Sequence, residues 1–180
     1  MNELIKDLGL LINATLIATP PLLLAALGSC FSERSGVVNI GIEGMMTIGA
    51  FTGAVMGLTT GNGWIAFFCA GLAGALFGLI HAFACISCHA DQTIAGTAIN
   101  FLGPGLALFL CKAMYNNSSD TPAMDPSCKL PKLFEGVFPT GSFWSNVLNV
   151  YAVAYLVFIL AFICWFVFYK TRFGAHLRAV

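Results

Sequence analysis

Two polar side chains stand out in ERSGVVNIGIEGMMTIGA, residues 33–50, a stretch that is otherwise apolar and rich in glycine. Asn39 and Glu43 are four residues apart, a spacing that places both on one face of a helix. Inside a bilayer a carboxylate is costly, and it usually faces a protein interior or a watery path. Two interpretations stand: Glu43 is an interfacial or structurally satisfied group, or the pair lines a path through the membrane.

Glycines interrupt the same stretch at Gly36, Gly41 and Gly44. They indicate close backbone approach or irregular helix geometry. Irregular backbone at membrane depth is tolerated only where protein or water covers it. We therefore expect this part of the chain to lie against a neighbouring helix.

The composition shows why a bilayer is the relevant solvent. Of 180 residues, 58% are hydrophobic and 9% are charged, whereas about 25% of a soluble domain is charged. The eight basic and eight acidic side chains cancel, so no basic tail indicates a nucleic-acid partner. Between Gly44 and Cys111 the only charged residue is Asp91. The composition predicts a membrane protein.

Long apolar runs define the expected helices. A helix needs about 20 apolar residues to cross a bilayer core of about 30 Å. Backbone polar groups in lipid must be satisfied within each segment, so the sequence predicts an all-α polytopic bundle. The expected spans are 8–31, 37–60, 63–88, 94–113 and 147–169.

Small residues recur at helical spacing in the second and third spans. Gly49, Gly53 and Gly57 are four apart in one, and Gly74 and Gly78 are four apart in the other. Membrane helices associate through such ridges because the backbones can touch. The ridges predict tight helix packing and no particular function.

No enzyme signature accompanies these features. The phosphate loop GxxxxGK[ST] and the HExxH and GxSxG motifs are absent from the sequence. We expect no cofactor, and any ATP hydrolysis would reside in a partner. Seven cysteines form no framework, and pairing of Cys111 with Cys128 stays open. His89, Asp91 and Gln92 are interpreted as a solvated turn between the third and fourth spans.

Charge counts alone do not orient the chain. With five spans, each side collects four Lys or Arg residues, so the positive-inside rule gives a tie. The basic cluster of Lys170, Arg172 and Arg178 follows the last span directly, and no acid opposes it. This favours a cytoplasmic C-terminal segment, with the N-terminus and the 112–146 loop outside.

Three segments carry a family resemblance. ATPPLLLAALGSCFSERSGVVNIGIEGMMTIGAF, residues 18–51, resembles the signature of permease subunits of ABC-type importers for simple sugars and nucleosides, most of all the purine-nucleoside branch. KTRFGAHLRAV, 170–180, resembles the start of that family's cytoplasmic coupling loop. QTIAGTAINFLGPGLALFL, 92–110, resembles its middle span, with Asn100 at the recurrent asparagine. The likeness covers nearly the whole chain and is weakest across 112–146.

The resemblance implies a multi-pass subunit of the bacterial cytoplasmic membrane that moves solute by alternating access. Its partners would be an ATP-binding cassette subunit, an external solute-binding protein, a second permease subunit and membrane lipid. Gly174 would allow a sharp turn after the last span. For the translocation core, the resemblance implies Asn39, Glu43 and Asn100. For coupling to the ATPase, it implies Thr171, Arg172, Phe173 and Gly174.

Nucleosides are the expected cargo. The alternatives are riboflavin, a simple sugar or a branched-chain amino acid, a truncated inactive remnant, or a non-transport membrane protein such as an assembly factor. Permeases of this class usually have about twice as many spans. The chain is therefore expected to be a fragment, a truncated product or one piece of a split gene.

Overall fold

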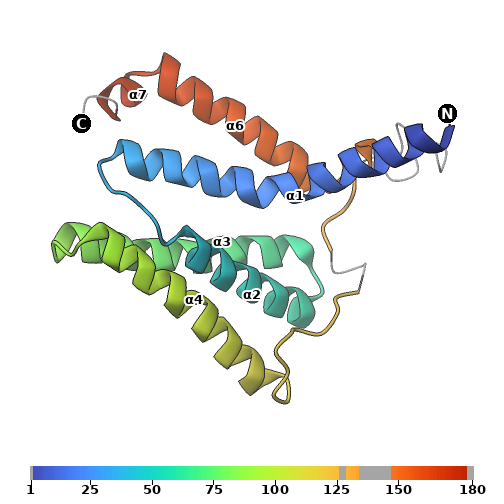
Figure 1. The fold of residues 1–180 in the computed structure, drawn as a ribbon, viewed down its shortest axis with the longest axis horizontal. Helices are drawn as coiled ribbons and strands as arrows, with labels where there is room; N and C mark the ends of the chain where they lie inside the picture. The colour runs from blue at the N-terminus through green and yellow to red at the C-terminus, as the bar shows by residue number, and fades with distance from the viewer. Residues whose placement is uncertain (1, 126–128, 134–146, 178–180) are drawn as a thin grey trace. The chain divides into compact units, whose positions relative to one another are not determined.

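The computed structural model describes residues 2–125, 129–133 and 147–177. In this part of the chain the regular structure is helical (Figure 1), apart from one bridge pair between Lys132 and Tyr151. Five of the described helices are long and apolar enough to cross a membrane. The predicted all-α architecture is confirmed, and its orientation stays a prediction.

The chain divides into two compact units, residues 29–129 and residues 1–28 with 130–180. In the first of these, helix α2 packs against both α3 and α4, which contact each other little. Its buried core joins all three helices through Ile48, Phe77, Ile99 and Ala107. The helices of this unit, after the end of α1 (Asn2–Arg34), are α2 (Ile42–Thr60), α3 (Gly63–Ala82), the π-helical turn Phe83–Ser87 and α4 (Gln92–Met114).

A tight connection joins α2 to α3. Gly61 ends α2 in the left-handed conformation, with a φ of 65°, and its N–H donates to the Gly57 carbonyl at 3.0 Å. A residue without a Cβ adopts this conformation most easily. The Asn62 side chain then caps α3 by accepting from the Trp64 N–H at 2.9 Å. The two helices therefore form an antiparallel hairpin.

A π-helical turn and a capped start separate α3 from α4. The turn Phe83–Ser87 continues α3 without a break. Asp91 then accepts hydrogen bonds from the Thr93 and Ile94 N–H groups at 2.9 and 3.0 Å, the pattern of a helix N-cap. Helix α4 continues through Pro104.

The other unit holds the first part of α1 together with α6 (Ala152–Lys170) and α7 (Arg172–Leu177). The Asn13 Nδ2 donates to the Asn149 carbonyl at 3.4 Å. Close by in the sequence, the Ala152 N–H donates to the Pro131 carbonyl at 3.0 Å. These bonds tie the start of α6 and the residues before it to α1 and to Pro131 of the 112–146 loop.

Helix α1 (Asn2–Arg34) extends beyond its predicted span 8–31 at both ends, and two other helices start later than predicted. The predicted span 37–60 begins too early, because α2 starts at Ile42. The predicted span 147–169 also begins too early, because α6 starts at Ala152. Cys128 lies outside the described residues, so its pairing with Cys111 stays untested.

Candidate functional site

The polar, glycine-rich stretch begins with a turn that stops α1. The Val37 N–H donates to the Ser32 carbonyl at 3.2 Å, and the Gly36 N–H donates to the Glu33 carbonyl at 3.1 Å. This pair of bonds is the Schellman motif, which needs a left-handed residue. Gly36 supplies it with a φ of 83°. Residues 36–44, named here the connecting segment, then run from α1 into the first turn of α2.

Gln92, at the start of α4, holds the beginning of the connecting segment. Its Oε1 accepts from the Val38 N–H at 2.7 Å, and its Nε2 donates to the Gly36 carbonyl at 3.3 Å. Gln92 lies in an exposed setting, as a solvated turn would, but its side chain also binds the connecting segment. Its amide replaces the backbone partners that an irregular segment lacks.

Asn100, two helical turns further along α4, holds the end of the connecting segment. Its Oδ1 accepts from the Gly44 N–H at 2.8 Å, and its Nδ2 donates to the Ile40 carbonyl at 2.9 Å. Helix α2 has no side-chain cap of its own at Gly41, and the N–H groups of a first turn need partners. Asn100 therefore caps α2 from a different helix.

Glycines allow this close approach of the two backbones. A Cβ at Gly44 would collide with the Ile99 carbonyl, and one at Gly103 would collide with the backbone of Gly44 itself. A Cβ at Gly96 would lie 3.0 Å from the Gly41 nitrogen, tighter than nearly all real contacts. Gln92, Gly96, Asn100 and Gly103 recur every three or four residues, so they share one face of α4.

Asn39 lies in the connecting segment and not on a helix, so the expectation that Asn39 and Glu43 share a helix face is wrong. The Asn39 Oδ1 accepts from the Gly41 N–H at 3.1 Å, a local turn of the kind that competes with helix formation. Glu43 lies in the first turn of α2 and is exposed on this chain. A negative charge there interacts favourably with the N-terminal end of the helix dipole.

The predicted glycine ridges lie between α2 and α3. A Cβ at Gly49 would be 3.1 Å from the Ala70 carbonyl oxygen, and one at Gly53 would be 3.1 Å from the Ala70 Cβ. A Cβ at Gly74 would be 3.6 Å from the Met45 carbonyl, an ordinary contact, and one at Gly78 would meet the same residue at 3.9 Å.

Gly57 differs from the other ridge glycines because it meets the loop after α4. A Cβ there would lie 2.6 Å from the Met124 Sδ and 3.6 Å from the Ala66 Cβ. Gly57 therefore provides room for a loop side chain as well as for α3.

The predicted coupling segment forms a short helix folded against the end of α6. Thr171 breaks the helical path with an extended backbone, and its Oγ1 accepts from the Gly174 N–H at 3.3 Å and donates to the Val167 carbonyl at 2.6 Å. A Cβ at Gly174 would collide with the Val167 and Phe168 carbonyls. Gly174 thus permits close packing, and the sharp turn expected of it is made by Thr171.

Two neighbours of Gly174 in this helix are open to a partner. Phe173 is 60% exposed, and Arg172 is also exposed. A large aromatic side chain with this exposure, beside a cation, is a typical feature of a protein–protein contact.

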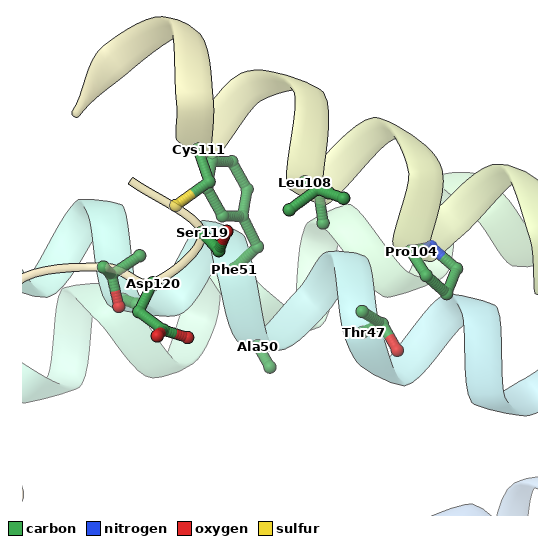
Figure 2. Close-up of a pocket in the computed structure, with 11 residues that line it drawn as sticks. Thr47, Ala50, Phe51, Pro104, Leu108, Cys111, Ser119 and Asp120 are labelled. Atoms are coloured by element: carbon green, nitrogen blue, oxygen red, sulfur yellow. The ribbon is translucent and has the colours of Figure 1, made fainter. Parts of the chain in front are cut away.

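A groove of about 370 Å³ lies between α2 and α4, beneath the loop that follows α4. We name it the α2–α4 groove. In Figure 2, Thr47 and Pro104 lie toward one end of it, and Cys111, Ser119 and Asp120 toward the other. Its lining residues are Thr47, Ala50, Phe51, Ala54, Pro104, Ala107, Leu108, Cys111, Ser119, Asp120 and Thr121.

The described residues thus form membrane-length apolar helices, a connecting segment held by amides and a short C-terminal helix with an exposed Phe173. Residues 11–180 match the protein family described as "Branched-chain amino acid transport system / permease component". The chain belongs to this family of permease components.

Individual relatives carry more specific names. The chain is 43% identical to the "Guanosine ABC transporter permease protein NupQ" of Bacillus subtilis (strain 168), over 99% of this chain and 57% of that protein. It is 32% identical to the "Nucleoside ABC transporter permease protein NupC" of Lactococcus lactis subsp. cremoris, over the same shares. The chain spans a little over half the length of these curated relatives. No solved structure matches it significantly.

The structure brings Asn100, which the resemblance groups with Asn39 and Glu43, against both ends of the Ile40–Gly44 stretch. Gln92, Gly96 and Gly103 were missed as members of this site. The sequence feature that could have identified them is the series of polar and small residues at helical spacing on one face of α4. A face of this kind can pack against the glycine-rich residues 36–44.

Proposed function

We propose that this chain is a membrane permease subunit of a binding-protein-dependent ABC importer for nucleosides. The observation that carries the proposal is the 43% identity to a guanosine permease across 99% of this chain. Transport proceeds by alternating access, and a separate ATP-binding cassette subunit hydrolyses ATP. An external solute-binding protein delivers the cargo, and a second permease subunit completes the path. The chain resides in the bacterial cytoplasmic membrane.

The connecting segment is proposed as part of the translocation core. It is irregular backbone at the entrance of a membrane-length helix, held by amides from α4. In other transporters, helix N-termini beside unwound backbone face substrate, and α2 begins beside such backbone after the end of α1. Asn100 and Asn39 fix the backbone of the segment, and the exposed Glu43 at its end faces the path or a partner subunit.

Residues 170–180 are proposed as the cytoplasmic coupling segment. In this arrangement the N-terminus and the 112–146 loop are external. Thr171 and Gly174 hold α7 against α6, so that Phe173 and Arg172 present a rigid contact to the ATPase subunit. Differential contacts with that subunit in its two states would drive the conformational change.

Cargo is tested by uptake. Cells that carry the chain with its neighbouring transporter genes should accumulate labelled guanosine, and the same cells should be offered glucose, riboflavin and leucine. Branched-chain amino acids are the second candidate, because the family description names them. Uptake of leucine and not of guanosine would replace the nucleoside proposal.

Two variants test the named roles in the same cells. Glu43→Gln keeps the shape and removes the charge, so guanosine uptake should fall while the chain still inserts in the membrane. Glu33→Gln, at the end of α1, is the matched control and should leave uptake unchanged. Phe173→Ala should weaken co-purification with the ATPase subunit. Normal uptake by Glu43→Gln and normal association by Phe173→Ala would reject these two roles.

A further inference from the structure

The α2–α4 groove has a defined floor of two helices. Helix α2 contributes Thr47, Ala50, Phe51 and Ala54, which recur at three- and four-residue intervals and so form one face. Helix α4 contributes an opposing face that includes Pro104 and three residues further along. Phe51 also packs against the buried core of this unit. The floor is therefore part of the folded bundle.

The loop that covers one end of the groove is held at both sides. After α4, the Ser118 N–H donates to the Tyr115 carbonyl at 2.9 Å, and the Ser118 Oγ donates to the Asp120 carbonyl at 2.8 Å. Beyond the groove, Met124 packs into the space that Gly57 leaves on α2. Residues 119–121 are thus carried across the groove between two anchored points.

The lining of the groove combines an aromatic face with hydrogen-bond acceptors. Phe51 offers a ring on which an aromatic ligand can stack, and stacking of this kind accepts any nucleic-acid base. Thr47 already donates its hydroxyl proton to the Glu43 carbonyl at 2.9 Å, so its oxygen has only acceptor capacity left. Asp120 supplies a carboxylate, which when ionised accepts only. Ligand N–H and O–H groups suit this lining.

The charge of the lining also limits which ligands the groove can bind. Among the eleven described residues that line the groove, Asp120 is the single charged group. A phosphate would meet a carboxylate without a compensating cation, which is unfavourable. The volume of about 370 Å³ is near the lower end of the range of about 300–1,000 Å³ for small-molecule pockets, so a compact neutral ligand fits better than a large one.

We propose that the α2–α4 groove is a nucleoside-binding site, in which the base lies on Phe51 and the ligand's N–H or O–H groups face Asp120. This inference rests on the proposed function and deepens it by placing the cargo on named residues. The site takes the uncharged nucleoside and rejects its 5′-phosphate. Asn39, Glu43 and Asn100 are not among its lining residues, although Thr47 of the lining bonds to the Glu43 carbonyl.

A cysteine at the groove floor measures occupancy directly. In the full chain reconstituted in lipid nanodiscs, Ala50→Cys is treated with a small thiol reagent, and mass spectrometry resolves position 50 from the seven native cysteines. Guanosine should slow the modification at least fivefold, and guanosine 5′-monophosphate at the same concentration should leave it unchanged. Thr59→Cys, exposed near the end of α2 and outside the lining, is the matched control and should not respond to either ligand.

Variants of the lining separate the two proposed contacts. Asp120→Asn should raise the guanosine concentration for half-protection about tenfold, the effect of losing a hydrogen bond to a charged group. Asp125→Asn, an exposed acid of the same loop, should leave it unchanged. Phe51→Leu keeps an apolar side chain packed on the core and removes the ring. It should also raise the guanosine concentration for half-protection about tenfold. Asp120→Lys should allow the 5′-monophosphate to protect.

The outcomes distinguish the site from the proposed function. Equal modification of Ala50→Cys with and without guanosine, in a chain whose cells take up guanosine, rejects the groove and leaves the importer proposal standing. Protection by glucose as strong as that by guanosine rejects the nucleoside assignment. Protection that Asp120→Asn and Phe51→Leu both leave unchanged also rejects it. Protection without uptake in cells supports the site and rejects the importer role.

Discussion

Helix α2 meets its two neighbours in different ways. Against α4, the connecting segment and the first turn of α2 exchange four hydrogen bonds with the amides of Gln92 and Asn100. There the backbones touch so closely that a Cβ at Gly44 or Gly103 would collide with main-chain atoms. Against α3, the contact is made through Gly and Ala surfaces, and a Cβ at Gly74 would find an ordinary contact at 3.6 Å.

This difference indicates which contact fixes the axial position of α2 relative to its neighbouring helices. Hydrogen bonds to an amide are directional and hold only at one axial position. Small-residue ridges gain van der Waals contact over a range of positions. We infer that α4 sets where α2 begins, whereas α3 provides a surface along which α2 packs. The four predictions that follow test this contrast, from the largest expected effect to the smallest.

The largest effect is expected at Gly103. Gly103→Ala places a Cβ against the backbone of Gly44, and backbone cannot rotate away as a side chain can. Overpacking typically costs about 1–3 kcal/mol and occasionally more. Because the contact is with backbone, we expect a loss in the free energy of unfolding at the upper end of this range, measured by SDS titration in mixed micelles. Gly105→Ala, on the same helix with nothing within 4 Å, is the control. Equal stability of the two variants would refute the close contact.

The next effect is expected at Asn100. Asn100→Leu removes the bonds to the Gly44 N–H and the Ile40 carbonyl, and side-chain hydrogen bonds in membrane proteins contribute about 0.6–1.7 kcal/mol each. The free energy of unfolding should fall by about 1–3 kcal/mol. Asn100→Asp retains the acceptor for the Gly44 N–H, but an ionised carboxylate would add a charge that is costly in a bilayer. Measured at acidic pH, where the carboxyl is neutral, it should cost less than Asn100→Leu. An equal loss in both variants would mean that capping of α2 is not the main contribution.

A smaller effect is expected at Gln92. Its donor bond to the Gly36 carbonyl is long, at 3.3 Å, and both of its bonds lie in an exposed setting, where water competes. Gln92→Leu should lower the free energy of unfolding by about 1 kcal/mol. Gln92→Glu preserves the acceptor for the Val38 N–H and should recover part of the loss. A drop larger than that of Asn100→Leu would invert the proposed order.

The smallest effect is expected on the α3 side, at Gly74. A Cβ there meets the Met45 carbonyl at ordinary distance, and alanine is the better helix former by about 1 kcal/mol. Gly74→Ala should therefore leave stability unchanged or raise it by up to that amount. Gly49→Ala, whose Cβ would lie 3.1 Å from the Ala70 carbonyl, should be less favourable. Strong destabilisation by Gly74→Ala would show that α3 also fixes the register.

The sequence predicted the helices well because apolar length is a local property. It could not predict where α2 begins, because that boundary depends on Gln92 and Asn100, more than fifty residues away in the chain. Asn39 was misplaced for a different, local reason: its apolar neighbours favoured a helix, but its side chain forms a turn with the Gly41 N–H instead. The groove could not be predicted either, because Phe51 and Asp120 are far apart in the sequence and line one groove only in the folded chain.

The cap that Asn100 gives to α2 has a consequence for the order of assembly. The ribosome delivers the connecting segment before it delivers α4, so the Gly44 N–H and the Ile40 carbonyl enter the membrane without their final partners. Until α4 arrives, water or lipid headgroups must satisfy them, which keeps the start of α2 near the membrane surface. We infer that the start of α2 reaches its final position only after α4 has been synthesised, when Asn100 can bond to both groups.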